Sequence, residues 1–386
     1  MSSLIPSGAN TYSKTRYPAS APKVADFTDG PWVTCENGRR YVDAVAALGP
    51  IILGHQYPAV HKAAFVQMNK GVSVSLPTTL EHDLAERLVK LVPGAEMCRF
   101  GKNGNDVVNA AVRVARAATG RNLVIRNGYH GHADWCIEEP MAGGVLRENR
   151  ISRMPISDLG SVQDGTVAAV VLDPCPAHDP TIQPPEYFYE IRRLCTEHGA
   201  LLIFDEMVTG FRMGWPNSLP VVPDLWCGAK ALGNGWPITA LVGKREYMER
   251  IERDVFYSTT FAGEAVSIAA ALACLDELAR HDVPRVLAEM GTRLRDWYAK
   301  EAAGRGLQYE TEIVGYPARP VFRWKRPELQ DAFSDGVIRG GMLFQGYVNL
   351  MLAHREAWSE ILVALSTGLD AALRVHATER MEATVP

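Results

Sequence analysis

Hydrophobic positions follow two different periods between residues 80 and 245, and their alternation predicts the architecture of this region. Segment 81–91 has helical spacing, because Leu84, Leu88 and Leu91 recur on one face. Short continuous apolar runs predict buried strands over 123–125, 168–172, 201–204 and 239–242. Such strands, separated by amphipathic helices, are typical of a mostly parallel sheet with helices on both faces. The sequence therefore predicts an α/β fold.

Residues that stop or start helices mark the ends of several predicted elements. The helix over 105–119 takes Asn105 as its N-cap and ends at Gly120, which suits a left-handed terminal position. A second helix opens at the proline pair 184–185 and ends at Gly199. Further long helices are predicted over 263–280, 284–302 and 355–375. These C-terminal helices indicate a second, smaller α/β domain.

The pattern divides the 386 residues into three parts. Residues 1–40 are rich in Ser, Pro, Thr and Gly, which predicts an extended arm with little regular structure and the start of a small domain. Residues 41–262 form the predicted large domain. Residues 263–386 form a connector helix and the C-terminal small domain. A chain of this length is expected to bury enough surface to fold without a disulfide or metal.

Composition narrows the class of protein without naming a partner. Hydrophobic residues make up 47% and charged residues 22%, the proportions of an ordinary globular protein. The net charge of -4 provides no attraction for nucleic acid or for an anionic membrane surface. No apolar run approaches the ~20 residues of a membrane span. The first residues also lack the charged and apolar regions of a signal peptide.

The seven cysteines are odd in number, sparsely spaced and free of any C-x-x-C pair. This spacing offers neither a zinc ribbon nor a thioredoxin motif. We expect reduced, mostly buried thiols, and therefore a cytoplasmic protein.

The common cofactor-binding and hydrolase signatures of parallel sheets are absent. The sequence contains no G-x-G-x-x-G, no G-x-x-x-x-G-K-[ST], no H-E-x-x-H and no G-x-S-x-G. Candidate chemistry is therefore sought at the carboxyl ends of the strands, where open α/β sheets place their ligands.

Two strand ends carry groups suited to catalysis. Asp205 ends the apolar run 201–204, a placement that presents a carboxylate to a dry crevice but also suits a cap on the next turn. Lys230 lies in the small, glycine-rich segment 228–235 before the apolar strand 239–242. An apolar surrounding lowers the pKa of an amine and makes it a nucleophile. The alternative is a lysine whose ammonium reaches out to solvent.

Two further loops suit a phosphate and a flat ring. The loop 101–105 places Gly104 and Asn105 at a helix N-terminus, where unpaired amides suit a phosphate, although most such loops are only turns. The acid at Asp106 must then point away. The motif YHGHAD over 129–134 offers Tyr129 for stacking. The same motif contains His130, His132 and Asp134, a pattern that could instead ligate a metal.

Taken together, the four signals match the needs of pyridoxal 5′-phosphate (PLP). This cofactor requires a Schiff-base lysine, an acid on its pyridine nitrogen and a phosphate cup. A metal-dependent hydrolase is the competing hypothesis, but it leaves Lys230 and its glycine-rich loop unexplained. We therefore expect PLP and no metal.

At this point the chain resembles the class III aminotransferases of PLP fold type I, and among them the glutamate-1-semialdehyde 2,1-aminomutase group. The matching stretches lie between residue 5 and about residue 280. They are IILGH at 51–55, YHGHAD at 129–134, LLIFDEMVTGFR at 201–212 and PDLWCGAKALGNG at 223–235. The resemblance implies a large domain with a seven-stranded, mostly parallel sheet, a smaller C-terminal domain, and a homodimer with shared active sites.

The resemblance also assigns roles by position. Lys230 matches the Schiff-base lysine, and Asp205 the acid that pairs with the pyridine nitrogen. Tyr129 matches the ring-stacking aromatic, with His130 beside it. The remaining cofactor-binding positions are Gly104 and Asn105 in the phosphate cup, Met207 beneath the ring, and Thr260, which reaches the phosphate of the neighbouring subunit. Lys14 falls where the aminomutase has a substrate-binding arginine.

Departures from the aminomutase pattern direct the functional prediction. Asn105 replaces a hydroxyl residue, which implies a backbone contact at that point of the cup. Lys14 lacks the bidentate geometry of a guanidinium. Segment 136–150 does not match the gating loop of the aminomutase. We therefore predict amino-group transfer between small amine and carbonyl substrates, with an intramolecular amino shift or an epimerisation as alternatives on the same scaffold.

Overall fold

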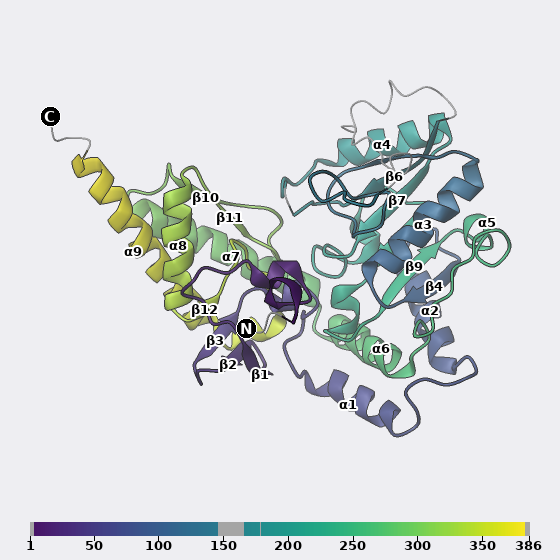
Figure 1. Cartoon of the computed structure of the whole chain (residues 1–386), viewed down its shortest axis with the longest axis horizontal. Coiled ribbons are helices and arrows are strands. Elements are labelled where there is room, and N and C mark those ends of the chain that lie inside the picture. Colours follow the sequence, from purple (N-terminus) through teal and green to yellow (C-terminus); the bar gives the residue numbers. More distant parts are fainter. Residues whose placement is uncertain (1–3, 146–165, 178, 383–386) are drawn as a thin grey trace. The chain divides into compact units, whose positions relative to one another are not determined.

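The computed structural model describes residues 4–145, 166–177 and 179–382, which divide into two compact units. The smaller unit comprises Met1–Tyr57 and Val286–Pro386, and the larger unit comprises Pro58–Arg285. Figure 1 shows the elements of both units along the chain. Within the described residues, no helix has the length and apolarity needed to cross a membrane.

A six-stranded sheet forms the centre of the larger unit, in the order β4-β9-β8-β7-β6-β5 (Figure 1). Its strands are β4 (Met97–Gly101), β5 (Leu123–Arg126), β6 (Val167–Leu172), β7 (Leu201–Glu206), β8 (Leu225–Gly228) and β9 (Thr239–Gly243). Strands β5 to β8 are parallel, and among the described strands only β9 runs in the opposite direction. The predicted mostly parallel α/β sheet is confirmed, with six described strands where seven were expected.

The helices of the larger unit confirm the predicted helical segments closely. They are α1 (Pro58–Met68), α2 (Thr79–Leu91), α3 (Gly104–Thr119), α4 (Pro185–His198), α5 (Arg245–Met248) and α6 (Ala265–Arg280). Helix α3 ends at Gly120 with a φ of 67°, as predicted. Its predicted N-cap was wrong by two residues: Asn103 occupies that position, because Asp106 binds the Asn103 amide and starts the helix earlier.

Alternation along the strands determines which side chains face the site. Val171, Ile203 and Cys227 belong to one core cluster with the buried residues of α3. On the opposite face, the Phe204 ring meets the edge of Phe188 from α4, with centroids 6.4 Å apart. Because successive side chains of a strand point to opposite faces, Asp205 lies on the α3 face.

The smaller unit contains two sheets and three long helices. One sheet has the order β1-β2-β3-β12, with β12 parallel to β3, and β10 pairs with β11 in the other. These strands are β1 (Ala25–Asp29), β2 (Trp32–Cys35), β3 (Arg40–Asp43), β10 (Thr311–Val314), β11 (Val321–Trp324) and β12 (Met342–Leu343). The helices are α7 (Val283–Gly304), α8 (Pro327–Arg339) and α9 (Trp358–Glu382).

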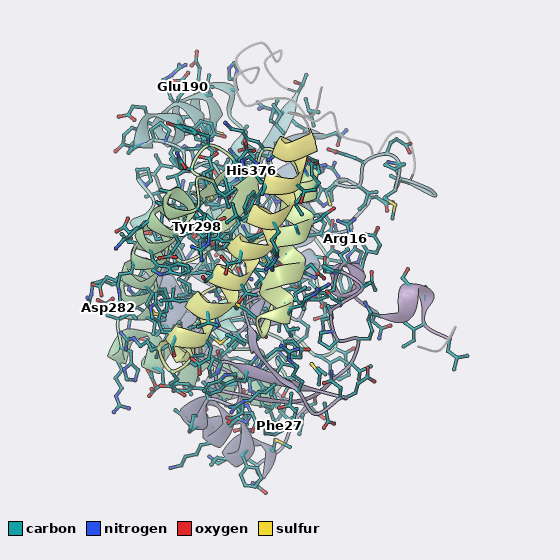
Figure 2. The ribbon with its side chains drawn as sticks, turned by 90° about the vertical axis from the view of Figure 1, so that its left-hand side faces the viewer. Arg16, Phe27, Glu190, Asp282, Tyr298 and His376 are labelled. Carbon is teal, nitrogen blue, oxygen red and sulfur yellow. The ribbon has the colours of Figure 1, made fainter. Side chains whose placement is uncertain are left out.

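Side-chain packing in the smaller unit is visible in Figure 2, where α9 crosses the view with His376 labelled on it. Helices α8 and α9 pack along each other. Behind them, the buried Tyr298 of α7 donates to or accepts from Thr311 of β10, with the two hydroxyl oxygens 2.8 Å apart (Figure 2). This bond ties α7 to the β10–β11 pair.

Short 3₁₀ helices connect several of these elements. They are η1 (Pro6–Gly8), η2 (Tyr12–Thr15), η3 (Ala46–Leu48), η6 (Pro216–Ser218), η7 (Lys230–Gly233) and η8 (Leu352–Arg355). Of the predicted arm over 1–40, the described residues 4–24 have only such turns. The expectation of little regular structure fails from residue 25 onward, because β1 and β2 pair with β3 in an antiparallel meander.

The unit boundaries differ from the predicted domain boundaries at 40/41 and 262/263. Residues 41–57 join the smaller unit because they bond to the C-terminal part of the chain: the Leu352 amide binds the Ile52 carbonyl at 2.8 Å, and the Ala353 amide the Leu53 carbonyl at 2.9 Å. Residues 263–285 join the larger unit because α6 packs against α1, α2 and η7.

Candidate active site

The carboxylate of Asp205 stands at the carboxyl end of β7, with 4% of the residue exposed. Its Oδ1 accepts a hydrogen bond from the Met207 amide at 3.2 Å. Its Oδ2 lies 2.6 Å from Nδ1 of His130. The five residues of β7 around it are all buried, so the carboxylate is held at the end of a dry strand. The alternative that Asp205 only caps a turn does not account for the contact with His130.

Both ring nitrogens of His130 are engaged. Nε2 contacts the backbone carbonyl of Asn127, and Nδ1 contacts Asp205. The indole of Trp135 stacks on the imidazole at a centroid distance of 6.2 Å and a 21° interplanar angle. A carbonyl oxygen only accepts, so Nε2 carries a hydrogen, and a second proton must lie between Nδ1 and Asp205. The pair therefore shares one proton, either as imidazolium with carboxylate or as imidazole with carboxylic acid.

Lys230 begins η7, two residues after the end of β8. Its φ of 44° lies in the left-handed region, which costs a residue other than glycine on the order of 1–3 kcal/mol. The turn is held from outside, because Ala231 and Leu232 are buried and the Cys274 thiol of α6 donates to the Ala231 carbonyl at 3.2 Å. The lysine itself is half-buried. The residues directly before and after Lys230 in the chain are buried and apolar, as predicted.

The loop between β4 and α3 leads into a helix N-terminus, where the first amides are unbonded within the helix. Gly104 and Asn105 are the first two residues of α3, so their amides have no carbonyl of the same helix to bind. Asp106 points away, as expected, because its Oδ2 accepts from the amides of Lys102 at 3.0 Å and Asn103 at 2.8 Å. These bonds keep the negative carboxylate behind the open amides.

The Asn105 side chain faces the motif at 129–134. Its Oδ1 accepts from the His132 amide at 2.9 Å. Its backbone amide and its side-chain Nδ2 are the donors that Asn105 could offer to a phosphate. Lys102, in the same loop, points instead to Glu264 before α6, with Nζ 2.9 Å from Oε2.

The residues present fit a PLP molecule, as two glycines show. A Cβ on Gly104 would lie 2.9 Å from the Met207 sulfur, and a Cβ on Gly131 would lie 2.6 Å from Oδ1 of Asn105. Gly131 also has a φ of 103°, a conformation that other residues rarely adopt. Side chains at either position would fill the space between the amide cup, Met207 and the 129–134 loop.

The other predicted residues differ in their placement. Tyr129 is 74% exposed, with its ring free of the core beside Gly128 and His130. Thr260 is exposed in the loop before α6. Lys14 belongs to the smaller unit, exposed in η2, and is not among the residues that the larger unit brings together.

Three polar residues near Asp205 escaped the sequence analysis: Asn127, Asp173 and Glu206. Asp173 follows β6 just as Asp205 ends β7, so an acid directly after the apolar run 168–172 was the signal that could have revealed it. Burial, and then the neighbouring charge of Asp205, raises the pKa of Asp173 to about 6. Burial likewise raises the pKa of Glu206 to about 8, while its Oε1 accepts from the Trp226 indole at 2.8 Å.

The competing metal hypothesis finds no support in the geometry of the motif at 129–134. His130 uses both nitrogens on Asn127 and Asp205. Across the parts of the chain that the structure describes, no three His, Cys, Asp or Glu side chains converge to hold a metal ion.

Solved structures resemble this fold over almost its whole length. The PLP-bound FumI protein of Sphingopyxis sp. MTA144, in its internal aldimine form, is 29% identical, covers 97% of this chain and 95% of its own, and has a TM-score of 0.90. An omega-transaminase from Sphaerobacter thermophilus has a TM-score of 0.85 at 24% identity, with 94% of each chain covered, which shows a shared fold. Fold and site together define a PLP-dependent enzyme of fold type I.

Sequence comparison makes the assignment more specific. The family model for class-III aminotransferases matches residues 16–142 and 139–304. The glutamate-1-semialdehyde 2,1-aminomutase of Syntrophobacter fumaroxidans is 35% identical over 83% of this chain and 81% of its own. The aminomutase of Natronomonas pharaonis is 33% identical over 81% of this chain and 75% of its own. The chain belongs to the class-III aminotransferase family.

Proposed function

We propose that this enzyme transfers an amino group between two small molecules, with Lys230 holding the PLP and Asp205 controlling its ring. The observation that carries the proposal is the buried Asp205–His130 pair at the carboxyl end of β7, on the face of the sheet toward α3. PLP supplies a conjugated ring that accepts electrons from the substrate carbon. Amino transfer is the reaction for which this family is named.

Each proposed residue has a distinct task. The Lys230 amine holds the cofactor at rest and, once a substrate amine replaces it, takes up and returns a proton at Nζ. The Asp205 carboxylate would favour a protonated pyridine nitrogen, while His130 orients it. Gly104 and Asn105 amides would bind the phosphate, and Tyr129 and Met207 would hold the two faces of the ring. Lys14 is proposed for substrate contact on the resemblance alone.

The second candidate function is an intramolecular amino shift, because the two curated relatives above carry the aminomutase name. The two reactions differ in their need for a second substrate. We expect that an amine donor alone converts the bound cofactor once and then stops, and that an added keto acid or aldehyde restores steady turnover. Absorbance of the bound cofactor and product analysis report both steps. Continuous isomerisation of a single amino-carbonyl substrate, without any acceptor, would instead establish the mutase.

We infer a homodimer from an apolar surface beside Thr260 in the larger unit. The exposed residues of this surface are Val72, Val74, Leu76, Phe256 and Phe261. The Ala265 amide binds the Val72 carbonyl at 2.9 Å, which joins the two segments that carry them. Exposed aromatic and aliphatic side chains grouped in this way are typical of a subunit interface. A second copy of this chain is the proposed occupant.

Mixing two inactive variants tests the shared site. Lys230→Ala and Thr260→Arg should each be inactive alone. In a mixed dimer both lesions fall in one site and the other site is intact, so random mixing should restore roughly a quarter of wild-type activity. Activity is measured after subunit exchange has been demonstrated with differently tagged chains. No recovery after such exchange, or an active monomer at assay concentration, would exclude the shared site.

We also infer a reducing compartment such as the cytoplasm. All seven cysteines are free thiols, and six of them are buried. Free, buried thiols are usual where glutathione keeps cysteines reduced.

A further inference from the structure

Arg319 is a buried arginine of the smaller unit, with only 6% of the residue exposed. Its guanidinium carbon lies 4.5 Å from the centroid of the Tyr347 ring, in a cation–π contact. Across the residues that the structure describes, no carboxylate forms an ion pair with this guanidinium and no acceptor is hydrogen-bonded to it. Burying a charge is costly unless the charge is paired. Arg319 is therefore suited to an anion that the described chain does not supply.

A short antiparallel pairing fixes the backbone on both sides of Arg319. Segment 346–350 is joined to segment 318–322 by amide–carbonyl hydrogen bonds of 2.9 Å, 3.0 Å and 3.1 Å, and by an isolated bridge at Tyr347. In this register Arg319 lies directly opposite Asn349, and Tyr347 is its diagonal neighbour. Because side chains alternate along paired segments, all three belong to the same face.

The Asn349 side chain leaves an acceptor open on this face. The residue is 2% exposed, and its Nδ2 donates to the Val45 carbonyl at 2.8 Å. Its Oδ1 is buried and has no hydrogen-bond partner among the described residues. Buried polar atoms in folded proteins are almost always satisfied by the protein, by water or by a ligand. A cation without an anion and an acceptor without a donor, on one face, together indicate that a polar group from outside the chain completes this site.

The buried carboxylate of the smaller unit already has partners of its own. Among the described residues of this unit, that carboxylate is Asp43, at the end of β3. Its Oδ1 accepts from the amides of Val45 at 3.0 Å and Ala46 at 2.9 Å. Its Oδ2 lies 2.9 Å from Nε2 of His55. Both oxygens are therefore engaged away from Arg319.

Hydrogen bonds connect the same face to the turn that carries Lys14. The Tyr347 hydroxyl donates to Oε1 of Gln345 at 3.3 Å, and Nε2 of Gln345 donates to the Ser13 carbonyl at 2.8 Å. Ser13 directly precedes Lys14 in η2. The lysine proposed above for substrate contact thus lies in a turn that is bonded to the segment holding the Arg319 guanidinium.

A planar guanidinium binds a carboxylate or a phosphate through paired hydrogen bonds. One guanidinium balances the single charge of a carboxylate, whereas a phosphate monoester carries about twice that charge. We propose that Arg319, held over Tyr347, is a binding site for a carboxylate. The source that we expect is the enzyme's own amino-acid or keto-acid substrate, so that Arg319 selects acids over simple amines. This source rests on the proposed function, whereas the site itself does not.

Thermal unfolding of the full chain measures carboxylate binding without any turnover. Succinate is the probe, and succinamide, which has the same skeleton without the charge, is its control. A ligand that binds only the folded state raises the unfolding temperature, and we expect saturating succinate to raise it by on the order of 3 °C in the wild type. Arg319→Met keeps the side-chain length over the ring and should abolish the rise. Arg319→Lys keeps the charge but loses the paired donors, so its apparent affinity for succinate should fall by about tenfold.

The matched control is Arg323→Met, which removes an exposed arginine of β11 that pairs with Glu312 at 3.6 Å. It should keep the full response to succinate. A wild-type response in Arg319→Met would overturn the proposal. So would a response to inorganic phosphate that exceeds the succinate response and is lost in Arg319→Met. Should Arg319→Met fail to fold, an undiminished succinate affinity in Arg319→Lys would overturn it instead.

Steady-state kinetics of the loaded enzyme identify the source of the carboxylate. Two pairs of amine donors differ only by that group: alanine with ethylamine, and 4-aminobutanoate with butylamine. Arg319→Met should raise the KM of whichever amino acid is turned over by at least about tenfold, with kcat little changed and the matching amine unaffected. An equal effect on acid and amine, or none on either, would overturn the assignment to the substrate, with the unfolding result standing by itself. Absence of amino transfer from every donor tested in the wild type would instead refute the proposed function.

Discussion

Lys230→Ala should abolish both the covalent attachment of PLP and measurable turnover. Lys230 is the lysine that follows β8, at the carboxyl edge of the sheet that also carries Asp205, in a turn whose backbone is held in a left-handed conformation. Alanine removes the amine that would bond to the cofactor, and η7 contains no other lysine that could replace it. We expect loss of the absorbance of the lysine-bound cofactor and loss of the borohydride-reducible linkage.

The control for this variant is Lys300→Ala, which removes an exposed lysine from α7. It should keep both the bound-cofactor absorbance and turnover. Circular dichroism of Lys230→Ala should match the wild type, since alanine keeps a Cβ and leaves the backbone cost of the left-handed φ unchanged. A borohydride-reducible linkage that survives in Lys230→Ala would defeat the assignment.

Asp205→Asn should still bind the cofactor covalently but lose at least ~10²-fold in turnover. The amide has the shape of the carboxylate and can still accept from the Met207 amide. It carries no charge, however, so it cannot favour a proton on the pyridine nitrogen or share one with His130. The defect should therefore fall on the rate of the chemical step, and not on attachment.

Stopped-flow absorbance with a saturating amine donor measures that step directly. Asp83→Asn makes the same chemical change on the exposed side of α2 and should leave the rate unchanged. Near-normal turnover in Asp205→Asn would show that Asp205 only caps the turn that follows β7.

Local patterns were enough to predict most of the regular elements of the larger unit. The apolar run 201–204 became the core of β7, and the Leu84 and Leu88 spacing became the buried face of α2. Asp205 and Lys230 were likewise visible, because a strand followed directly by an acid, and a lysine among small residues, are contrasts between neighbours in the chain.

Other features depended on partners far away in the sequence. Residues 25–35 have little apolar periodicity, and only their pairing with β3 makes them strands. Residues 263–285 read as a connector, and only the packing of α6 on α1 places them in the larger unit. Each of these outcomes depends on contacts between segments that are far apart in the sequence. The periodicity within one segment does not show which other segment it contacts.

The sequence by itself therefore determined the α/β class, the family and the two residues proposed to carry the chemistry. Only the tertiary structure decided which polar groups surround them. Asn127, Asp173 and Asp205 follow or end three strands that are far apart in the chain. One chain of hydrogen bonds connects them through His130, because β5, β6 and β7 are neighbours in the sheet. Strand order is fixed by the packing of whole helices and strands, which no local run of residues records.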